Sequence, residues 1–230
     1  MADRPSLIAA ALTAELAPVC RRLGLQAESG KPPGAWRGAY VDRRVIAAPT
    51  GAGRERAAES IRSLIERYTP GRVLIVGTAG AADPALRSGQ VLIPAIVLDE
   101  ATGQRLAPTL ETDTAGTLCT AAGLVGSPAQ KLRLFRELGA TAVDMETAAM
   151  AEVCDQHGVP WLCVRCVLDA ADECLPDWLL RLTHPDGRAN LPAAARCMIL
   201  RPWRTALLLS LAVRTRRGMS AVAEQLRTLL

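Results

Sequence analysis

The sequence predicts a single α/β domain in which helices flank a central, mixed and largely parallel twisted sheet, with a helical C-terminal extension. The chain has 230 residues, half of them hydrophobic, which suits one large domain with a sizeable core. Short apolar runs alternate with amphipathic stretches, as in sheets that helices cover on both faces. We expect one domain over 1–230, with its helical C-terminal part over 174–230.

The apolar runs are interpreted as buried strands because they are short and continuous. The stretches between them are interpreted as helices because their apolar residues recur on one face, as Ile61 and Ile65 do in the helix that begins near Arg54. Thr13 can cap the first helix, and Pro128 suits the start of the third. The expected strands cover about 7–12, 44–49, 72–77, 90–98, 140–143 and 161–168, the helices about 13–23, 54–68, 128–138 and 146–157, and the loops 30–34 and 99–116.

Charge and composition argue against several classes of protein. The formal net charge of +4 is too small to indicate nucleic-acid binding. Seven cysteines at irregular spacings form no disulfide framework, which favours a cytoplasmic protein. The first apolar run is too short for a secretory signal, and no stretch reaches the ~18 apolar residues of a transmembrane helix. With only two histidines in the chain, we expect no metal site.

Three carboxylates follow expected strands: Glu15, Glu146 and Asp169. Each has an ordinary explanation, since acidic residues stabilise the first turn of a helix and aspartate often caps one. Ligands of parallel sheets, however, bind at the carboxyl ends of the strands. One sheet edge would gather all three side chains, and carboxylates in unlike environments can divide into an acid and a base.

Two further patterns are weaker. Gly51, Gly53 and Arg54 form either a glycine-rich turn or an anion site, in which backbone N–H groups near a helix start would bind the ligand. Cys163 and Cys166 have the spacing of redox and zinc motifs. They lie inside an expected strand, where a spacing of three sends side chains to opposite faces, so we reject that interpretation.

Several segments together resemble the nucleoside phosphorylase and nucleosidase superfamily. The resemblance follows the order of the chain across most of residues 6–173, which makes it more specific than any single motif. The segments are Leu7 to Leu16, Gly77-Thr78-Ala79-Gly80, Val143-Asp144-Met145-Glu146-Thr147-Ala148-Ala149, Gly158-Val159-Pro160-Trp161 and Val164 to Asp172.

The resemblance implies a role for each matched residue. Asp169 would protonate the purine at N7, Glu146 would hydrogen-bond the ribose hydroxyls, and Glu15 would position the attacking water. Met145 would pack on the sugar, and Arg165 would orient the carboxylates. The remaining implied substrate-binding residues are Thr78, Ala79 and Gly80 at the ribose end and Leu124 in the base region, where relatives have a stacking aromatic. Leu168 departs from the family pattern, which often has a serine that holds the aspartate.

Within the superfamily, the chain is most similar to the hopanoid-associated phosphorylases, also described as adenosylhopane nucleosidases. The features are a short connection between Leu98 and Val143, a Ser-Pro-x-x-Lys segment at 127–131, and a Leu-rich basic helix after Arg201. This implies release of adenine from a lipid-linked adenosine. The alternatives are a methylthioadenosine/adenosylhomocysteine nucleosidase, a purine nucleoside phosphorylase and, least favoured, a non-catalytic nucleoside- or lipid-binding module.

Hydrolysis is favoured over phosphorolysis. Val76 stands where hexameric phosphorylases have a phosphate-binding arginine, and Glu15 suits water better than an anion. No cofactor is expected, although a phosphorylase would use inorganic phosphate as co-substrate. The family implies a homodimer or higher oligomer. Residues 202–217, with Trp203 and terminal arginines, would either contact the inner face of a membrane or pack on the core or a dimer interface.

Overall fold

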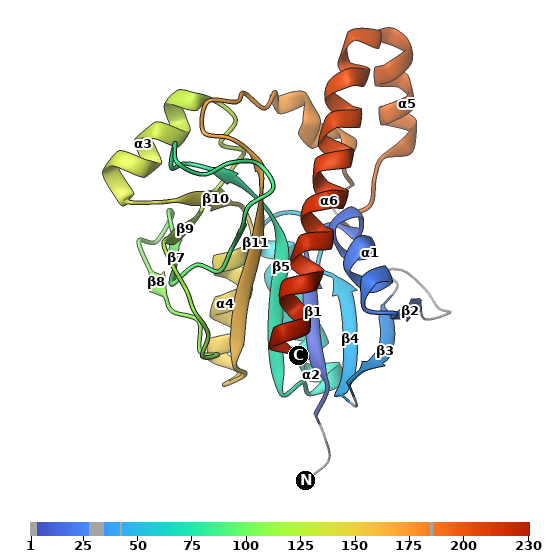
Figure 1. Ribbon diagram of the computed structural model, residues 1–230, viewed down its shortest axis with the longest axis vertical. Coiled ribbons are helices and arrows are strands. Elements are labelled where there is room, and N and C mark those ends of the chain that lie inside the picture. Colours follow the sequence, from blue (N-terminus) through green and yellow to red (C-terminus); the bar gives the residue numbers. More distant parts are fainter. Residues whose placement is uncertain (1–3, 28–34, 42, 185) are drawn as a thin grey trace.

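One mixed sheet organises the chain. The computed structural model describes residues 4–27, 35–41, 43–184 and 186–230, so the expected loop at 30–34 lies outside the described residues. Within them, the sheet has eleven strands, nine of which follow the order β2-β3-β4-β1-β5-β10-β9-β7-β8, while β11 pairs with β5 and β6 (Figure 1). β1 runs parallel to β4 and β5, and β11 runs parallel to β5. The expected fold class is confirmed.

The strands are β1 (Ser6–Ala10), β2 (Gln26–Ala27), β3 (Trp36–Tyr40), β4 (Arg43–Pro49), β5 (Arg72–Ala81), β6 (Val91–Leu92), β7 (Ile96–Asp99), β8 (Arg105–Leu106), β9 (Thr117–Thr120), β10 (Ala142–Asp144) and β11 (Trp161–Asp169). The α-helices are α1 (Thr13–Arg22), α2 (Arg54–Tyr68), α3 (Pro128–Leu138), α4 (Thr147–Gln156), α5 (Leu191–Leu200) and α6 (Thr205–Leu229). Two 3-10 helices, η1 (Asp177–Leu182) and η2 (Pro202–Arg204), lie between β11 and α6.

Alternation along β1 builds a core on each face of the sheet. Leu7 belongs to the same buried cluster as Ile61 of α2, on the face that α2 and α4 cover. Ile8 belongs to the cluster of Leu16 and Met219, on the face that α1 and α6 cover. Successive strand residues point to opposite faces, so β1 is apolar throughout because both of its faces are buried. Cys163 and Cys166 also fall into these two separate clusters, which confirms their predicted opposite orientation.

Helix α6 has two different halves. Its second half packs on the sheet, and a Cβ atom at Gly218 would lie 2.4 Å from the Cys166 sulfur, so the glycine permits the close approach to β11. Its first half rises beyond the sheet beside α5 (Figure 1). No residue from 191 to 217, all of which are described, is buried. Among the described helices, none is long and apolar enough to cross a membrane.

Three local predictions need correction. The single strand expected over 90–98 is two short strands, β6 and β7, with Pro94 between them. Thr13 is the first residue of α1 rather than its cap, and Leu12 occupies the N-cap position. Strands β2, β3, β8 and β9 were not predicted, and β8 lies inside the loop expected over 99–116. β2 and β8 have only two residues each, the partly exposed β3 has no continuous apolar run, and the four-residue β9 is polar at both ends.

Candidate active site

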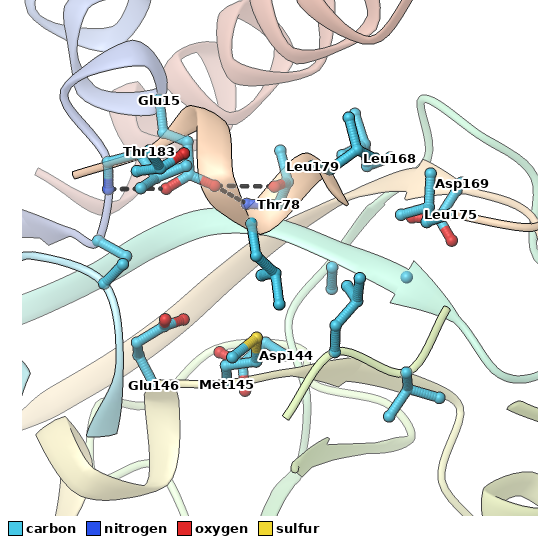
Figure 2. Close-up of a pocket in the computed structure, with 18 of the residues that line it drawn as sticks. Glu15, Thr78, Asp144, Met145, Glu146, Leu168, Asp169, Leu175, Leu179 and Thr183 are labelled. Atoms are coloured by element: carbon cyan, nitrogen blue, oxygen red, sulfur yellow. Dashed lines mark hydrogen bonds between the residues drawn. The ribbon is translucent and has the colours of Figure 1, made fainter. Parts of the chain in front are cut away.

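A cavity of about 610 Å³ lies where the carboxyl ends of β1, β5 and β11 meet (Figure 2). This is the sheet edge at which we expected the three carboxylates, and all three line it. Glu15 and Glu146 lie on opposite sides, and Asp169 lies at a third point (Figure 2). Ten of the twelve candidate site residues line this cavity: Glu15, Gly53, Thr78, Ala79, Gly80, Leu124, Met145, Glu146, Arg165 and Asp169.

Glu15 is buried and held by three donors. Its Oε1 accepts hydrogen bonds from the backbone N–H and the hydroxyl of Thr78, both at 2.8 Å, and its Oε2 accepts one from the backbone N–H of Leu12 at 3.2 Å. The carboxylate therefore links the start of α1 to β5. Thr78, which we expected at the ribose end of the site, orients Glu15 through these two hydrogen bonds.

Glu146 occupies the N-cap position of α4 and lines the cavity. Its Oε1 accepts a hydrogen bond of 2.9 Å from the backbone N–H of Gly53. Burial raises the pKa of Glu146 to about 7, and the nearby Asp144 carboxylate adds to that increase, while the Gly53 N–H opposes it. Glu146 can therefore gain or lose a proton near neutral pH.

Arg165 pairs with Asp144, a residue that the sequence analysis did not single out. The guanidinium Nη2 lies 2.7 Å from Asp144 Oδ2, and both side chains are buried. The Thr120 hydroxyl donates to Asp144 Oδ1 at 2.7 Å, and the backbone N–H of Thr147 donates to Oδ2 at 3.1 Å. Asp144 stands directly before the Met-Glu pair, and this position was the available signal.

Asp169 ends β11 beside a second missed residue, Lys131. The ammonium group of Lys131 donates to Asp169 Oδ2, and both side chains are almost fully buried. Burial raises the pKa of Asp169 above its ordinary value, although the Lys131 ammonium opposes the increase. Leu168 gives no hydroxyl to hold this carboxylate, and Lys131 holds it instead. The lysine was visible in the Ser-Pro-x-x-Lys segment, but nothing in the sequence joined it to Asp169.

The residues expected to bind an anion are already engaged. The backbone N–H of Gly51 donates to the Ala11 carbonyl at 3.1 Å, and that of Gly53 donates to Glu146. The Arg54 guanidinium pairs with Asp99 through both of its terminal nitrogens and does not line the cavity. The structure therefore does not bring these groups together as an anion site.

Leucines form another part of the cavity wall. η1 and the first half of α6 contribute them, and both elements come from the C-terminal part of the chain. These residues are Leu179, Leu180, Leu182, Leu208 and Leu211. The cavity thus combines a carboxylate-rich region at the edge of the sheet with an apolar wall.

Comparisons with known proteins show similarity to nucleosidases and to the phosphorylase superfamily. Residues 100–197 match the model of the phosphorylase superfamily. A 5′-methylthioadenosine/S-adenosylhomocysteine nucleosidase of Staphylococcus haemolyticus is 28% identical over 167 residues, covering 60% of this chain and 73% of the relative. The Helicobacter pylori nucleosidase of the same name superposes with a TM-score of 0.75 at 18% identity over 99% of this chain and 98% of that one. The futalosine hydrolase of H. pylori gives 0.65 at 20% identity over 74% and 89%.

Proposed function

We propose that this chain hydrolyses the bond between adenine and a ribose whose 5′ carbon bears a bulky apolar group. Its residues 100–197 match the phosphorylase superfamily, and its similarity to nucleosidases indicates an enzyme of the nucleosidase or nucleoside phosphorylase type. The observation that carries this proposal is that one cavity is lined both by carboxylates at the edge of the sheet and by leucines from η1 and α6. Adenosylhopane, an adenosine with a hopanoid at its 5′ carbon, has matching chemistry. A small thioether nucleoside would leave much of the leucine wall without a contact.

The proposed reaction divides the work among the three carboxylates. Asp169 donates a proton to N7 of the base as the glycosidic bond breaks, so the bonding electron pair leaves with a neutral base. Glu146 accepts hydrogen bonds from the ribose hydroxyls and stabilises the cationic sugar. Glu15 orients a water molecule toward the anomeric carbon and takes its proton as the new C–O bond forms.

The charges around the cavity support hydrolysis over phosphorolysis. The carboxylates of Glu15 and Glu146 line it, whereas the cation Arg165 is buried and paired with Asp144. Val76, at the position of the phosphorylase arginine, is fully buried in the core. A phosphate dianion would therefore meet like charges, which disfavour its binding. Water carries no such penalty.

We predict that purified protein releases adenine from adenosylhopane, presented in detergent, and that phosphate does not change the rate. Adenine and the sugar product are measured by chromatography and mass spectrometry, with methylthioadenosine as the comparison substrate. We expect a higher kcat/KM for adenosylhopane because its tail contacts the leucine wall. A requirement for phosphate, with a sugar phosphate as product, would replace hydrolysis by phosphorolysis. Release from neither nucleoside would refute the proposed function.

We further propose that the hairpin of α5, η2 and the first half of α6 contacts an anionic membrane surface. Large apolar side chains are exposed along it, including Ile199 and Trp203 at 78% and 73% exposure. Residues 188–217 contain seven arginines and no acidic residue. Their charge exceeds the net charge of +4 of the whole chain, so the rest of the chain carries a net negative charge. Basic and apolar residues together favour an anionic lipid surface, while a second copy would present a face of the same charge. Homo-oligomerisation through other surfaces stays a prediction.

We predict that the protein co-floats with vesicles containing anionic lipid and that Trp203→Glu weakens this association at least tenfold. The substitution places a negative charge where an apolar side chain would enter the lipid. Val41→Glu is the matched control, because Val41 is 76% exposed but lies far along the chain, between β3 and β4. Equal flotation with neutral and anionic vesicles, or unchanged flotation of Trp203→Glu, would contradict the contact. Self-association lost in Trp203→Glu, without lipid binding, would assign the face to a second copy.

A further inference from the structure

Lys131 is a buried cation for which the reaction above gives no role. Its side chain is 0% exposed, and lysine is rarely buried so completely unless it is paired. Lys131 lies in the second turn of α3. Ser127 caps this helix by accepting a hydrogen bond from the Gln130 N–H at 3.3 Å. A buried charge on a capped helix indicates that Lys131 has a specific role in the site.

The ammonium group is fully used. Besides Asp169 Oδ2, it donates to the carbonyl oxygens of Ala170 at 2.7 Å and Glu173 at 2.8 Å. An ammonium group has three protons to donate, and each has an acceptor here. Lys131 therefore fixes both the Asp169 carboxylate and the segment that follows β11.

The two oxygens of Asp169 are left in different states. Oδ2 accepts a hydrogen bond from Lys131, whereas Oδ1 accepts none from the residues that the structure describes. Asp169 lines the cavity, whereas Lys131 does not. A proton placed on Oδ2 would compete with the lysine, so Oδ1 is the oxygen available for a proton.

We propose that Lys131 is a positioning residue that fixes Oδ2 of Asp169, so that Oδ1 carries the proton and donates it to the base. This inference rests on the proposed function, in which Asp169 is the acid. Lys131 itself transfers no proton and touches no substrate. Many family members hold the aspartate with a serine, which is Leu168 in this chain. The charge-assisted hydrogen bond from Lys131 takes the place of that serine.

The charged surroundings of Asp169 allow a direct test. Lys131 from α3 and Arg214 from α6 lower the pKa of this carboxyl, whereas burial, the largest effect, and Glu173 raise it. Arg214 pairs with Glu173 at 2.5 Å, so Lys131 is the cation that acts on Asp169 directly. Without Lys131, less positive charge opposes the effect of burial, so the pKa of Asp169 is expected to rise further.

The experiment follows the Asp169 carboxyl carbon by NMR in protein labelled at the aspartate carboxyl, with Asp169→Asn used for assignment. In Lys131→Met we expect the titration midpoint to move up by at least one pH unit, a tenfold change in protonation, and kcat to fall more than KM changes. Lys131→Arg keeps the cation and should stay nearer the wild-type midpoint. Arg133→Met removes an exposed cation from the same helix and should leave the midpoint unchanged.

Lys131→Gln is the second neutral variant, with the same expected direction, in case Lys131→Met does not fold. A midpoint within 0.3 pH units of wild type in the neutral variants (roughly twofold in protonation), or an equal movement in Arg133→Met, would overturn the assignment. The NMR titration needs no substrate. A wild-type protein that releases no base, but whose Asp169 midpoint still depends on Lys131, would refute the proposed function and leave the positioning contact in place.

Discussion

Asp169→Asn is expected to lower kcat by about 10²–10⁴-fold, the usual contribution of a general acid, while nucleoside binding changes little. The substitution keeps the size of the side chain and an oxygen that can accept from Lys131, but removes the acidic proton. Because the site is otherwise intact, the loss should appear in kcat rather than in KM. Steady-state kinetics of adenine release, together with calorimetric binding of the nucleoside, separate the two effects.

Asp172→Asn is the matched control for this variant. It makes the same chemical change three residues later, at an exposed position that does not line the cavity, and should keep wild-type turnover. Near-normal kcat in Asp169→Asn would remove Asp169 as the acid. Loss of nucleoside binding in that variant would show instead that the carboxylate serves affinity.

The sequence predicted the layers of the fold well because buried parallel strands leave a strong local signal. The runs at β1, β5 and β11 are apolar at almost every position, since helices cover both faces. Edge and short strands leave no such signal. In β3, half-buried and exposed residues alternate without an apolar run, and pairing with β4 rather than local pattern defines it.

The site was predicted in part for a similar reason. Glu15, Glu146 and Asp169 could be placed because each lies at the end of a strand or within a few residues after it, and the sequence reveals those strand ends. Their partners come from elsewhere in the chain: Lys131 is 38 residues from Asp169, and Asp144 is 21 residues from Arg165. Contacts over such separations depend on how α3 and β10 pack, and a single sequence carries no local signal for this.

Gly77→Ala is expected to destabilise the protein by about 3 kcal/mol, because it would displace a buried ion pair. A Cβ atom at Gly77 would lie 1.8 Å from Arg165 Nη1 and 3.3 Å from Glu15 Oε1. The guanidinium cannot move freely, since Asp144 holds its other nitrogen at 2.7 Å. Moving Arg165 away would leave the Asp144 carboxylate buried without its cation. Urea unfolding monitored by circular dichroism measures the change in the free energy of unfolding.

Gly123→Ala separates this effect from the general consequence of replacing a glycine. A Cβ atom there would meet nothing within 4 Å, so its free energy of unfolding should stay within about 0.5 kcal/mol of wild type. Gly77→Ala should also lose turnover, because the same Cβ would press on the carboxylate proposed to orient water. If Gly77→Ala unfolded at the wild-type urea concentration, the close contact between Arg165 and β5 would not contribute to stability. Arg165 would then hold Asp144 from a position that tolerates the extra methyl group.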